Sequence, residues 1–397
     1  MRRRVVLGAA ILALVGIAGA QRKPYEPSVR RPARGTRGVI AAGTDHGTEA
    51  ALRIYHLGGN AVDAGVAATL AGSIAEYSHF GFGGESPILL RTPDGKVFSI
   101  AGIGTMPKSA TADFFRNRRM QPGEFFGGEM EPGGMKGVVP VAGLMPALVP
   151  GMIDAVLVAL RDFGSRSLAE AMQPAIELAD GMPLDEMRAG SIMRSQRFFE
   201  LWPTSKRVFL SQGRYQMPGD IFRQPDLART MRAMVEVERK ARKGGASRVA
   251  AIDAVRDYFY RGEIARKIDQ FMKDNNGLLR YEDMAAFRLQ PEPAASTTYR
   301  GYEVYKPGFW SQGPVLLQAL NILEGVDLQG MRHNSADYLH NVVEAMKLSY
   351  ADRDTYYGDP KFGEVPAQTL LSKEYGAERR ALISSRGSQE FRPGKAG

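Results

Sequence analysis

Apolar residues recur at helical spacing in the first part of the chain. A helix is predicted over 46–57, and Gly58-Gly59 ends it as a helix C-terminal cap would. Asn60 begins a second helix, and Asp63 follows near the positive end of its dipole. Four apolar residues spaced four apart form one stripe of this helix: Val62, Val66, Leu70 and Ile74. The residues between them are mostly Ala and Gly, so other elements can approach closely, and we expect this helix to be buried.

Strand-like patterns are few and short. Two apolar runs, 88–90 and 97–100, flank Asp94-Gly95, a dipeptide typical of a tight hairpin. A further run at 39–42 is predicted to be a buried strand, and strand signal returns at 302–305. Helical patterns cover most of the rest. We therefore expect an α+β fold that is mostly helical, with too few strands for a complete sheet.

Three further features organise the chain. Ser167 with Glu170 forms a capping box at the start of one helix. Asn334 with Asp337 is predicted to cap a last long helix. The Gly-rich segment 121–137 is predicted to be a mobile loop.

The N-terminus has the pattern of a secretory signal peptide. Arg2 to Arg4 precede a short apolar run, and Ala18-Gly19-Ala20 supplies the small residues that a signal peptidase recognises. We expect residues 1–20 to be removed, the Pro- and Arg-rich residues 21–37 to be a flexible leader, and residues 38–397 to form the folded part. The alternative is an uncleaved membrane anchor, although the run is short for a membrane span. An exported protein without cysteine suits a periplasmic or secreted location, with no membrane contact after cleavage.

The net charge of +9 raises the question of nucleic-acid binding. Basic residues gather over 229–248, but Glu236 and Glu238 are interleaved among them, as on a solvated helix face. No aromatic interleaving or recognition motif accompanies them. We therefore expect a charged surface helix and no nucleic-acid partner.

Residues that could carry chemistry are sparse. Cysteine is absent, which excludes thiolate metal sites and a cysteine nucleophile. His340 and Glu344 lie four apart without an evident third ligand, so we expect no metal site. Ser296-Thr297-Thr298 offers hydroxyls without a neighbouring base. The Gly cluster at 81–84 lacks the Lys-Ser/Thr of a phosphate loop. These residues alone identify neither a cofactor nor a convincing nucleophile.

Several motifs, in order along the chain, together resemble the large subunit of the gamma-glutamyltransferase (gamma-glutamyltranspeptidase) family. They are Gly58-Gly59-Asn60-Ala61-Val62-Asp63-Ala64, the Gly-rich loop 81–85, Val149-Pro150-Gly151, Gln173-Pro174-Ala175, Asn321-Ile322-Leu323-Glu324, Ala351-Asp352-Arg353 and Tyr357-Gly358-Asp359-Pro360. The resemblance runs from about 39 to 395. It implies the large-chain part of an N-terminal-nucleophile hydrolase with an αββα sandwich, whose sheet a small chain completes.

The resemblance also implies where catalysis takes place. In this family the precursor cuts itself before a Thr, whose hydroxyl becomes the nucleophile and whose freed α-amine becomes the base. Arg392-Pro393-Gly394-Lys395 resembles the segment just ahead of that cut. We therefore expect the nucleophilic Thr after Gly397 and no catalytic residue in this chain. The implied partners are a small catalytic subunit from the same precursor and a small-molecule amide substrate, without a cofactor.

Two departures from the family concern substrate binding. The family has an Arg-Glu pair whose Arg binds the substrate's α-carboxylate. Alignment on the following proline puts Ile103 at the Arg and Gly104 at the Glu, followed by Thr105. The family's PPPSSGG becomes a bulkier segment that contains Trp310 and Ser311. We expect these five residues to bind substrate, and the acyl group to be more apolar than gamma-glutamyl, as in the acylase-like branch.

Three functions follow from these patterns. The leading hypothesis is the large chain of an exported, self-processing N-terminal-Thr amidohydrolase or acyltransferase, which cleaves gamma-glutamyl or related acyl amides through an acyl-enzyme. The first alternative is a glutathione hydrolase and gamma-glutamyl transferase proper. The second alternative is a non-catalytic helical binding protein that retains only the scaffold.

Overall fold

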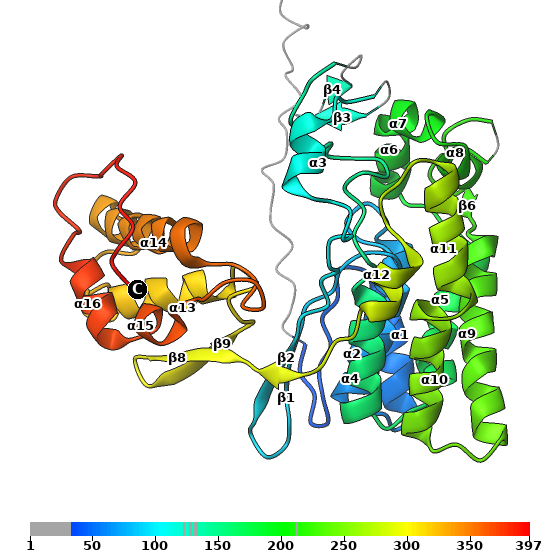
Figure 1. The fold of residues 1–397 in the computed structure, drawn as a ribbon. Helices are drawn as coiled ribbons and strands as arrows, with labels where there is room; N and C mark the ends of the chain where they lie inside the picture. Colours follow the sequence, from blue (N-terminus) through cyan, green and yellow to red (C-terminus); the bar gives the residue numbers. More distant parts are fainter. Residues whose placement is uncertain (1–32, 122–123, 127–128, 131–133, 212) are drawn as a thin grey trace, which may run out of the picture. The chain divides into compact units, whose positions relative to one another are not determined.

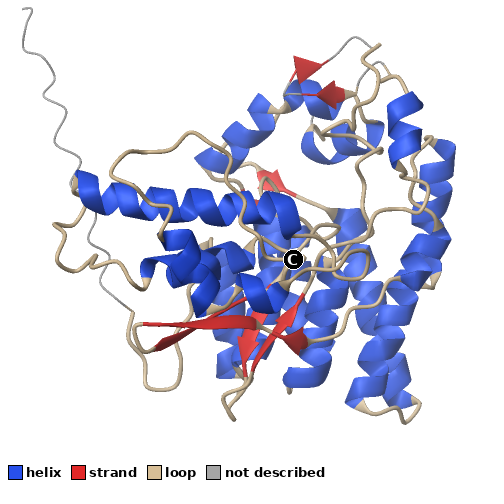
Figure 2. Cartoon of the chain, turned by 60° about the vertical axis from the view of Figure 1, so that its left-hand side comes forward, coloured by secondary structure: helices blue, strands red, loops and turns tan. Residues whose placement is uncertain are grey.

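The computed structural model describes residues 33–121, 124–126, 129–130, 134–211 and 213–397. The signal peptide expected over 1–20 and most of the expected leader lie outside the described residues. The chain divides into two units, Met1–Val39 and Ile40–Gly397, and the second contains every helix and strand of the described part (Figure 1). Helix predominates over strand (Figure 2). No helix among the described residues is both long and apolar enough to cross a membrane.

The first two predicted helices are confirmed as α1 (Asp45–His56) and α2 (Ala61–Ala75). Their junction is fixed by a capping box, in which the Asp63 backbone N–H donates to the Asn60 side chain and the Asn60 N–H donates to the Asp63 carboxylate. The buried Asp63 carboxylate also accepts hydrogen bonds from the Ser165 amide (2.8 Å) and hydroxyl (2.7 Å). Most of α2 is buried, as its small residues predict.

Helix α4 (Met152–Phe163) lies in the main hydrophobic core. Each of its residues from 152 to 160 is buried. It contacts α2 and α10 (Arg248–Tyr260), while α5 (Leu168–Asp180) packs between α2 and α9 (Pro225–Lys243). The predicted capping box of Ser167 and Glu170 is confirmed at the start of α5. The other helices of this part are α3 (Ala112–Asn117), α6 (Glu186–Arg194), α7 (Gln196–Glu200), α8 (Pro203–Phe209), α11 (Glu263–Asp274) and α12 (Tyr281–Ala286).

The predicted hairpin is confirmed as β1 (Ile88–Arg91) and β2 (Val97–Ile100), with Leu90 opposite Phe98. A third strand, β7 (Glu292–Pro293), pairs antiparallel with the other edge of β2. The remaining described strands form two-stranded pairs: β3 (Phe125–Phe126) with β4 (Glu129–Met130), β5 (Met182–Pro183) with β6 (Ile221–Phe222), and β8 (Ala295–Tyr299) with β9 (Tyr302–Lys306). The strands of the described residues are therefore as sparse as predicted.

The chain after β9 forms four helices: α13 (Gly313–Leu323), α14 (Ala336–Tyr356), α15 (Ala367–Leu370) and α16 (Lys373–Arg380). Two buried carboxylates of α14 hold the last residues of the chain. Glu344 accepts a hydrogen bond from the Arg392 guanidinium (2.7 Å), and Asp352 accepts one from the Gly394 amide (2.8 Å). The segment 388–396 is therefore anchored along α14.

Two local predictions are wrong. Residues 39–42 form no strand, and Val39 is 61% exposed, because no neighbouring strand pairs with this short run among the described residues. Asn334 is not the cap of α14. It adopts a left-handed conformation (φ 58°), which Asn tolerates, and the Ser335 hydroxyl caps the helix instead. The described part of 121–137 contains β3 and β4, so the predicted loop is partly a short hairpin.

Candidate functional site

Three loops that carry family-like motifs meet at the start of α4: residues 81–85, 101–105 and 149–151. The carbonyl of Gly84 accepts hydrogen bonds from the amides of Gly151 (3.1 Å) and Met152 (2.9 Å). The first N–H groups of a helix have no partner within the helix. The Gly-rich loop therefore satisfies the N-terminus of α4 and is fixed to it.

The middle loop, 101–105, is held from both sides by backbone contacts. The Ser86 amide donates to the Gly102 carbonyl (2.9 Å), and the Val149 amide donates to the carbonyl of the loop's last residue (3.1 Å). A Cβ atom on Gly102 would lie 1.9 Å from the Ser86 carbonyl oxygen, and one on Gly104 would lie 1.7 Å from that of Val149. Gly102 also has φ +58°. Both positions therefore require glycine.

Two side chains of the middle loop, and one from the Gly-rich loop, define this part of the site. Ile103 is half-buried and Thr105 is exposed. Desolvation raises the pKa of the Glu85 carboxyl above its usual value, and the nearby Gly104 backbone amide opposes this effect only in part. Glu85 was not among the residues expected to bind substrate. The available signal was a carboxylate directly after a run of glycines.

Trp310 and Ser311 lie in the turn before α13. The Trp310 indole N–H donates to the carboxylate of Glu292, and the Ser311 hydroxyl donates to the Gly308 carbonyl (2.9 Å). Glu292 lies in β7, opposite Ser99 of β2, and β2 leads directly into the middle loop. Within the described residues, no hydrogen bond joins the middle loop to Trp310 or Ser311. The five expected residues therefore form two groups that are linked through β7.

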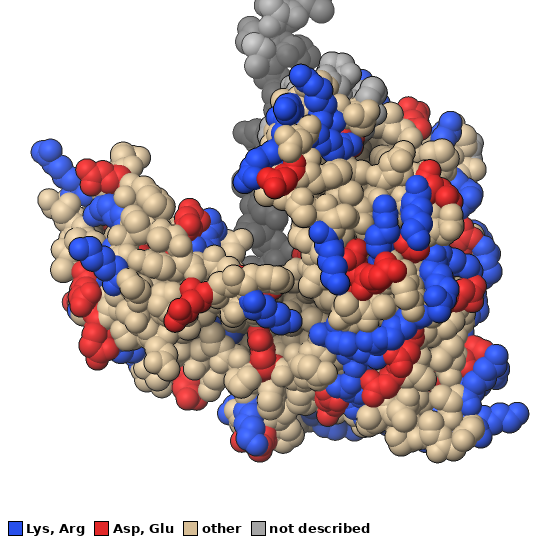
Figure 3. All heavy atoms as spheres, in the orientation of Figure 1, with Lys and Arg blue, Asp and Glu red and all other residues tan. Residues whose placement is uncertain are grey.

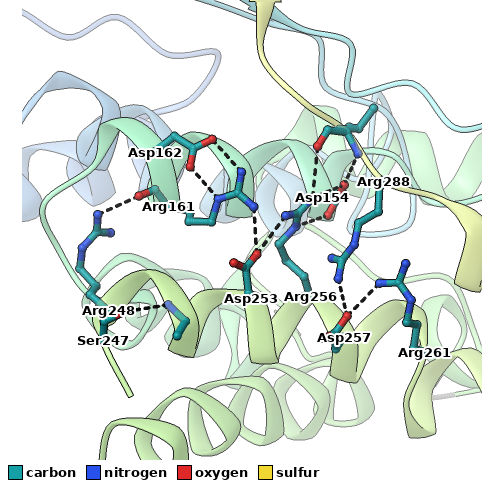
Figure 4. Close-up of polar contacts among 12 residues, drawn as sticks. Asp154, Arg161, Asp162, Ser247, Arg248, Asp253, Arg256, Asp257, Arg261 and Arg288 are labelled. Carbon is teal, nitrogen blue, oxygen red and sulfur yellow. Dashed lines mark hydrogen bonds and ion pairs between the residues drawn. The ribbon is translucent and has the colours of Figure 1, made fainter. Parts of the chain in front are cut away.

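A buried ion pair fixes the first turn of α4 behind the loops (Figure 4). The Asp154 carboxylate accepts two hydrogen bonds from Arg256 of α10, from Nε (2.7 Å) and Nη2 (3.0 Å), and a third from the Leu289 amide (2.6 Å). Burial lowers the pKa of Arg256, but its bonds to Asp154 and Asp253 outweigh burial and raise it. Asp253 also accepts a hydrogen bond from Arg161 (2.9 Å), which extends the network towards the surface.

Other candidate residues from the sequence have structural partners. The Thr297 hydroxyl donates to the buried side chain of Asn321 (2.6 Å). His340 and Glu344 engage different groups: the His340 ring nitrogen lies 2.7 Å from a backbone carbonyl, and Glu344 binds Arg392. The mixed-charge helix predicted within 229–248 is confirmed as α9, where Arg239 pairs with Glu236. The prediction is wrong for Glu238, which is buried: its carboxylate accepts hydrogen bonds from the amides of Leu168 (2.8 Å) and Ala169 (3.0 Å), which have no partner within α5. Basic and acidic side chains are interspersed over the helical face seen in Figure 3.

Comparison with known sequences identifies relatives over most of the chain. The sequence model of the gamma-glutamyltranspeptidase family matches residues 47–396. The chain is 31% identical over 376 residues to the glutathione hydrolase proenzyme of Escherichia coli (strain K12) and 30% identical over 370 residues to the acylase ACY 1 proenzyme of Pseudomonas sp. (strain SE83). Each match covers 93% of this chain, and it covers 60% and 62% of the respective relative.

Solved structures show the same relationship. The gamma-glutamyltranspeptidase of Helicobacter pylori superposes with a TM-score of 0.79 at 25% identity, over 91% of this chain and 97% of that chain. The cephalosporin acylase of Bacillus halodurans superposes with a TM-score of 0.75 at 27% identity, over 94% of this chain and 65% of that one. The fold is therefore the mixed helix-and-sheet fold of gamma-glutamyltranspeptidases and acylases.

The sequence motifs, the family match and the structural neighbours agree with one another, and they confirm the predicted resemblance. The chain spans less than two thirds of the length of the two curated relatives. It belongs to the gamma-glutamyltranspeptidase family.

Proposed function

We propose that this chain is the large-chain portion of an exported, self-processing amidohydrolase or acyltransferase, and that a small chain of the same precursor supplies an N-terminal Thr nucleophile. Family membership supports the reaction class. The names of both curated relatives include the word proenzyme, which supports processing. The 60–62% coverage of these relatives is consistent with a second part.

The proposed reaction is acyl transfer through an ester intermediate. The Thr hydroxyl attacks the substrate's amide carbonyl while the Thr α-amine accepts the hydroxyl proton. The C–N bond then breaks, and the amine product leaves with that proton. Water attacks the resulting ester, releases the carboxylic acid and restores the hydroxyl; an acceptor amine in place of water gives transfer. An α-amine suits this role because its pKa lies near neutrality.

The observation that carries the proposed specificity is Ile103. Its alkyl side chain stands where the family-like pattern has an Arg, and it cannot pair with a carboxylate as a guanidinium does. We infer that the natural acyl group lacks an α-carboxylate at this point. In this proposal Ile103, Gly104 and Thr105 lie on one side of the acyl pocket, and Trp310 and Ser311 lie on another.

Glutathione hydrolysis is the second candidate function. The 31% identity to the Escherichia coli glutathione hydrolase proenzyme favours it. This candidate requires a cation other than residue 103 to bind the substrate carboxylate. The third candidate, a binding protein without catalysis, requires that no Thr-led chain is produced.

The test uses protein purified from the complete gene in its native host. Intact mass and N-terminal sequencing are expected to show two chains, the second beginning with Thr, in the periplasmic or secreted fraction. Hydrolysis of a phenylacetyl amide is expected to exceed hydrolysis of glutathione. Faster glutathione hydrolysis would instead favour the second candidate. A single unprocessed chain that cleaves neither amide would contradict the enzyme proposal and favour the binding protein.

A further inference from the structure

The last described residues of the chain are held through their backbone by two side chains of α14. The buried Asp352 carboxylate accepts a hydrogen bond from the Gly394 amide (2.8 Å). The Tyr356 hydroxyl donates to the Gly394 carbonyl (2.6 Å) and accepts from the Ala396 amide (3.2 Å). Residues 394 and 396 lie outside any helix or strand, so these side chains satisfy backbone groups that secondary structure does not satisfy.

A third side chain, from α16, completes the contact. The Arg379 guanidinium donates to the Arg392 carbonyl and lies 3.1 Å from the Asp352 carboxylate. Arg379 is 3% exposed and Asp352 is 0% exposed, so water and salt screen this ion pair little. We refer to Asp352, Tyr356 and Arg379 as the tail clamp, and to residues 388–396 as the tail.

The side chains of the tail also match their surroundings. The Arg392 guanidinium donates to the buried Glu344 carboxylate (2.7 Å). A Cβ atom on Gly394 would overlap the Tyr375 hydroxyl, so the chain passes where glycine is needed. Ala396 is buried in a hydrophobic cluster with Tyr375. A charged side chain, an absent side chain and a small apolar side chain therefore fit the body of the protein at alternate residues of the tail.

We propose that the tail clamp promotes self-processing of the precursor. The clamp holds the chain against the folded body as far as residue 396, so only the residues between the clamp and the cut remain as a free tether. This inference rests on the proposed function, which puts a Thr-led small chain after this one. A short tether keeps the peptide bond that is cut close to the groups that cut it, because the effective concentration of tethered groups rises as the tether shortens.

The bond changes at the cut show why proximity matters and why the clamp itself does not react. The hydroxyl of the Thr attacks the carbonyl carbon of the residue before it; the peptide C–N bond breaks as an ester forms, and the hydroxyl proton passes to the freed α-amine. Water then attacks the ester, leaves a carboxylate at the end of the large chain and restores the hydroxyl. Asp352, Tyr356 and Arg379 take no part in these steps and act as positioning residues.

The expected size of the effect follows from the length of the tail. Release of residues 388–396 from α14 adds about nine residues to the free tether, and the effective concentration falls as about the −3/2 power of tether length. For a tether about as long as the tail, release doubles the length and lowers the rate of processing by about threefold.

The first test changes the tail and leaves the tail clamp intact. Gly394→Ala puts a Cβ atom against the Tyr375 hydroxyl, and pulse-chase labelling of the complete precursor is expected to show processing slowed by about threefold. Adding Tyr375→Phe removes that hydroxyl, which makes no hydrogen bond among the described residues, and is expected to restore at least part of the rate. The matched control is Gly387→Ala, because a Cβ atom there lies 3.7 Å from the Glu344 carboxylate, an ordinary contact, and the rate is expected to stay unchanged.

The second test changes the clamp and leaves the tail intact. Tyr356→Phe removes both hydrogen bonds of the hydroxyl and is expected to slow processing by up to about threefold. The matched control is Tyr350→Phe, an exposed tyrosine of the same helix, which is expected to leave the rate unchanged. Once processed, both variants are expected to hydrolyse the phenylacetyl amide with the kcat/KM of the unsubstituted enzyme, because the tail clamp acts before the enzyme is complete.

An insertion adds a readout that a merely structural role of the clamp would not move. About nine Gly and Ser residues placed directly after Gly397 lengthen the tether with the clamp intact, and they are expected to slow processing by the same factor of about three. An unchanged rate in the insertion variant, or in both Gly394→Ala and Tyr356→Phe, would overturn the tether role and leave the amidohydrolase proposal intact. A kcat/KM of processed Tyr356→Phe that falls as far as its processing rate would also overturn it. A complete protein that is never cut would overturn both proposals.

Discussion

Replacing Asp154 with Asn is expected to destabilise the protein by about 3–5 kcal/mol. Asp154 is 0% exposed and Arg256 is 2% exposed, so neither charge can be hydrated when its partner is lost. Asn keeps the shape of Asp but leaves the Arg256 guanidinium buried and charged. It also replaces one acceptor oxygen by an amide group that donates hydrogen bonds. The loss of stability is therefore expected to lie at the upper end of the range for single substitutions of buried polar residues.

Thermal unfolding converts this free energy into a measurable shift. For a cooperative unit of about 360 residues, the unfolding entropy is about 0.75 kcal/mol per kelvin. A loss of about 3–5 kcal/mol therefore lowers the unfolding midpoint by about 4–7 °C. Differential scanning calorimetry of the complete protein and the Asp154→Asn variant measures this shift directly.

Two further variants define what would refute this reasoning. Glu263→Gln removes an exposed pair with Lys267 on α11, which solvent screens, and is expected to leave the unfolding midpoint almost unchanged. The double variant Asp154→Leu/Arg256→Met removes both buried charges and is expected to recover part of the single-variant loss. Full recovery is not expected, because the Leu289 amide loses its acceptor. A midpoint shift below about 1 °C for Asp154→Asn, equal to that of the exposed control, would show that the buried pair does not stabilise the fold.

Three other predictions follow from described contacts. Gly104→Ala forces a Cβ atom against the Val149 carbonyl oxygen and is expected to lower the free energy of unfolding in urea by about 1–3 kcal/mol. The control is Gly81→Ala, because a Cβ atom there meets open space. Equal losses of stability in the two variants would contradict the steric argument. Asp352→Asn is expected to accelerate amide hydrogen exchange over 388–396, and unchanged exchange would show that this carboxylate does not anchor the segment. Burial raises the pKa of Asp63, but its hydrogen bonds outweigh burial and lower the pKa overall. The stability that Asp63 contributes is therefore present above about pH 4 and is lost as the pH falls through its folded-state pKa. The difference in thermal unfolding midpoint between the protein and the Asp63→Asn variant should narrow from pH 7 to pH 3, and a constant difference would refute this reasoning.

Elements that carry their own local signal could be predicted from the sequence. The apolar stripe of α2, the Asp94-Gly95 hairpin and the Ser167 capping box each depend on residues that lie close together in the sequence. Val39 belonged to an apolar run of four, too short for a period to distinguish a strand from an irregular segment. Asn334 and the adjacent Ser are both good caps, and the choice between them depended on backbone conformation.

The candidate site could be predicted only in part. The motif order pointed to the family, and therefore to Ile103 as a departure from it. The bond between the Ser86 amide and the Gly102 carbonyl depends on how two loops meet around the β1–β2 hairpin, and no local sequence pattern reports that pairing. The same holds for Glu292 and Trp310, which only the addition of β7 to β2 brings together.

Because peptide groups hold the Gly-rich loop, the middle loop and the start of α4 together, their framework is insensitive to the side chains that project from it. Glu85, Ile103 and Thr105 can be exchanged without breaking these bonds, whereas Gly102 and Gly104 cannot. Under the proposed function, a duplicated gene would acquire a different substrate through one or two codon changes. For the same reason, a directed-evolution library restricted to those three codons would retain folded protein in nearly every member.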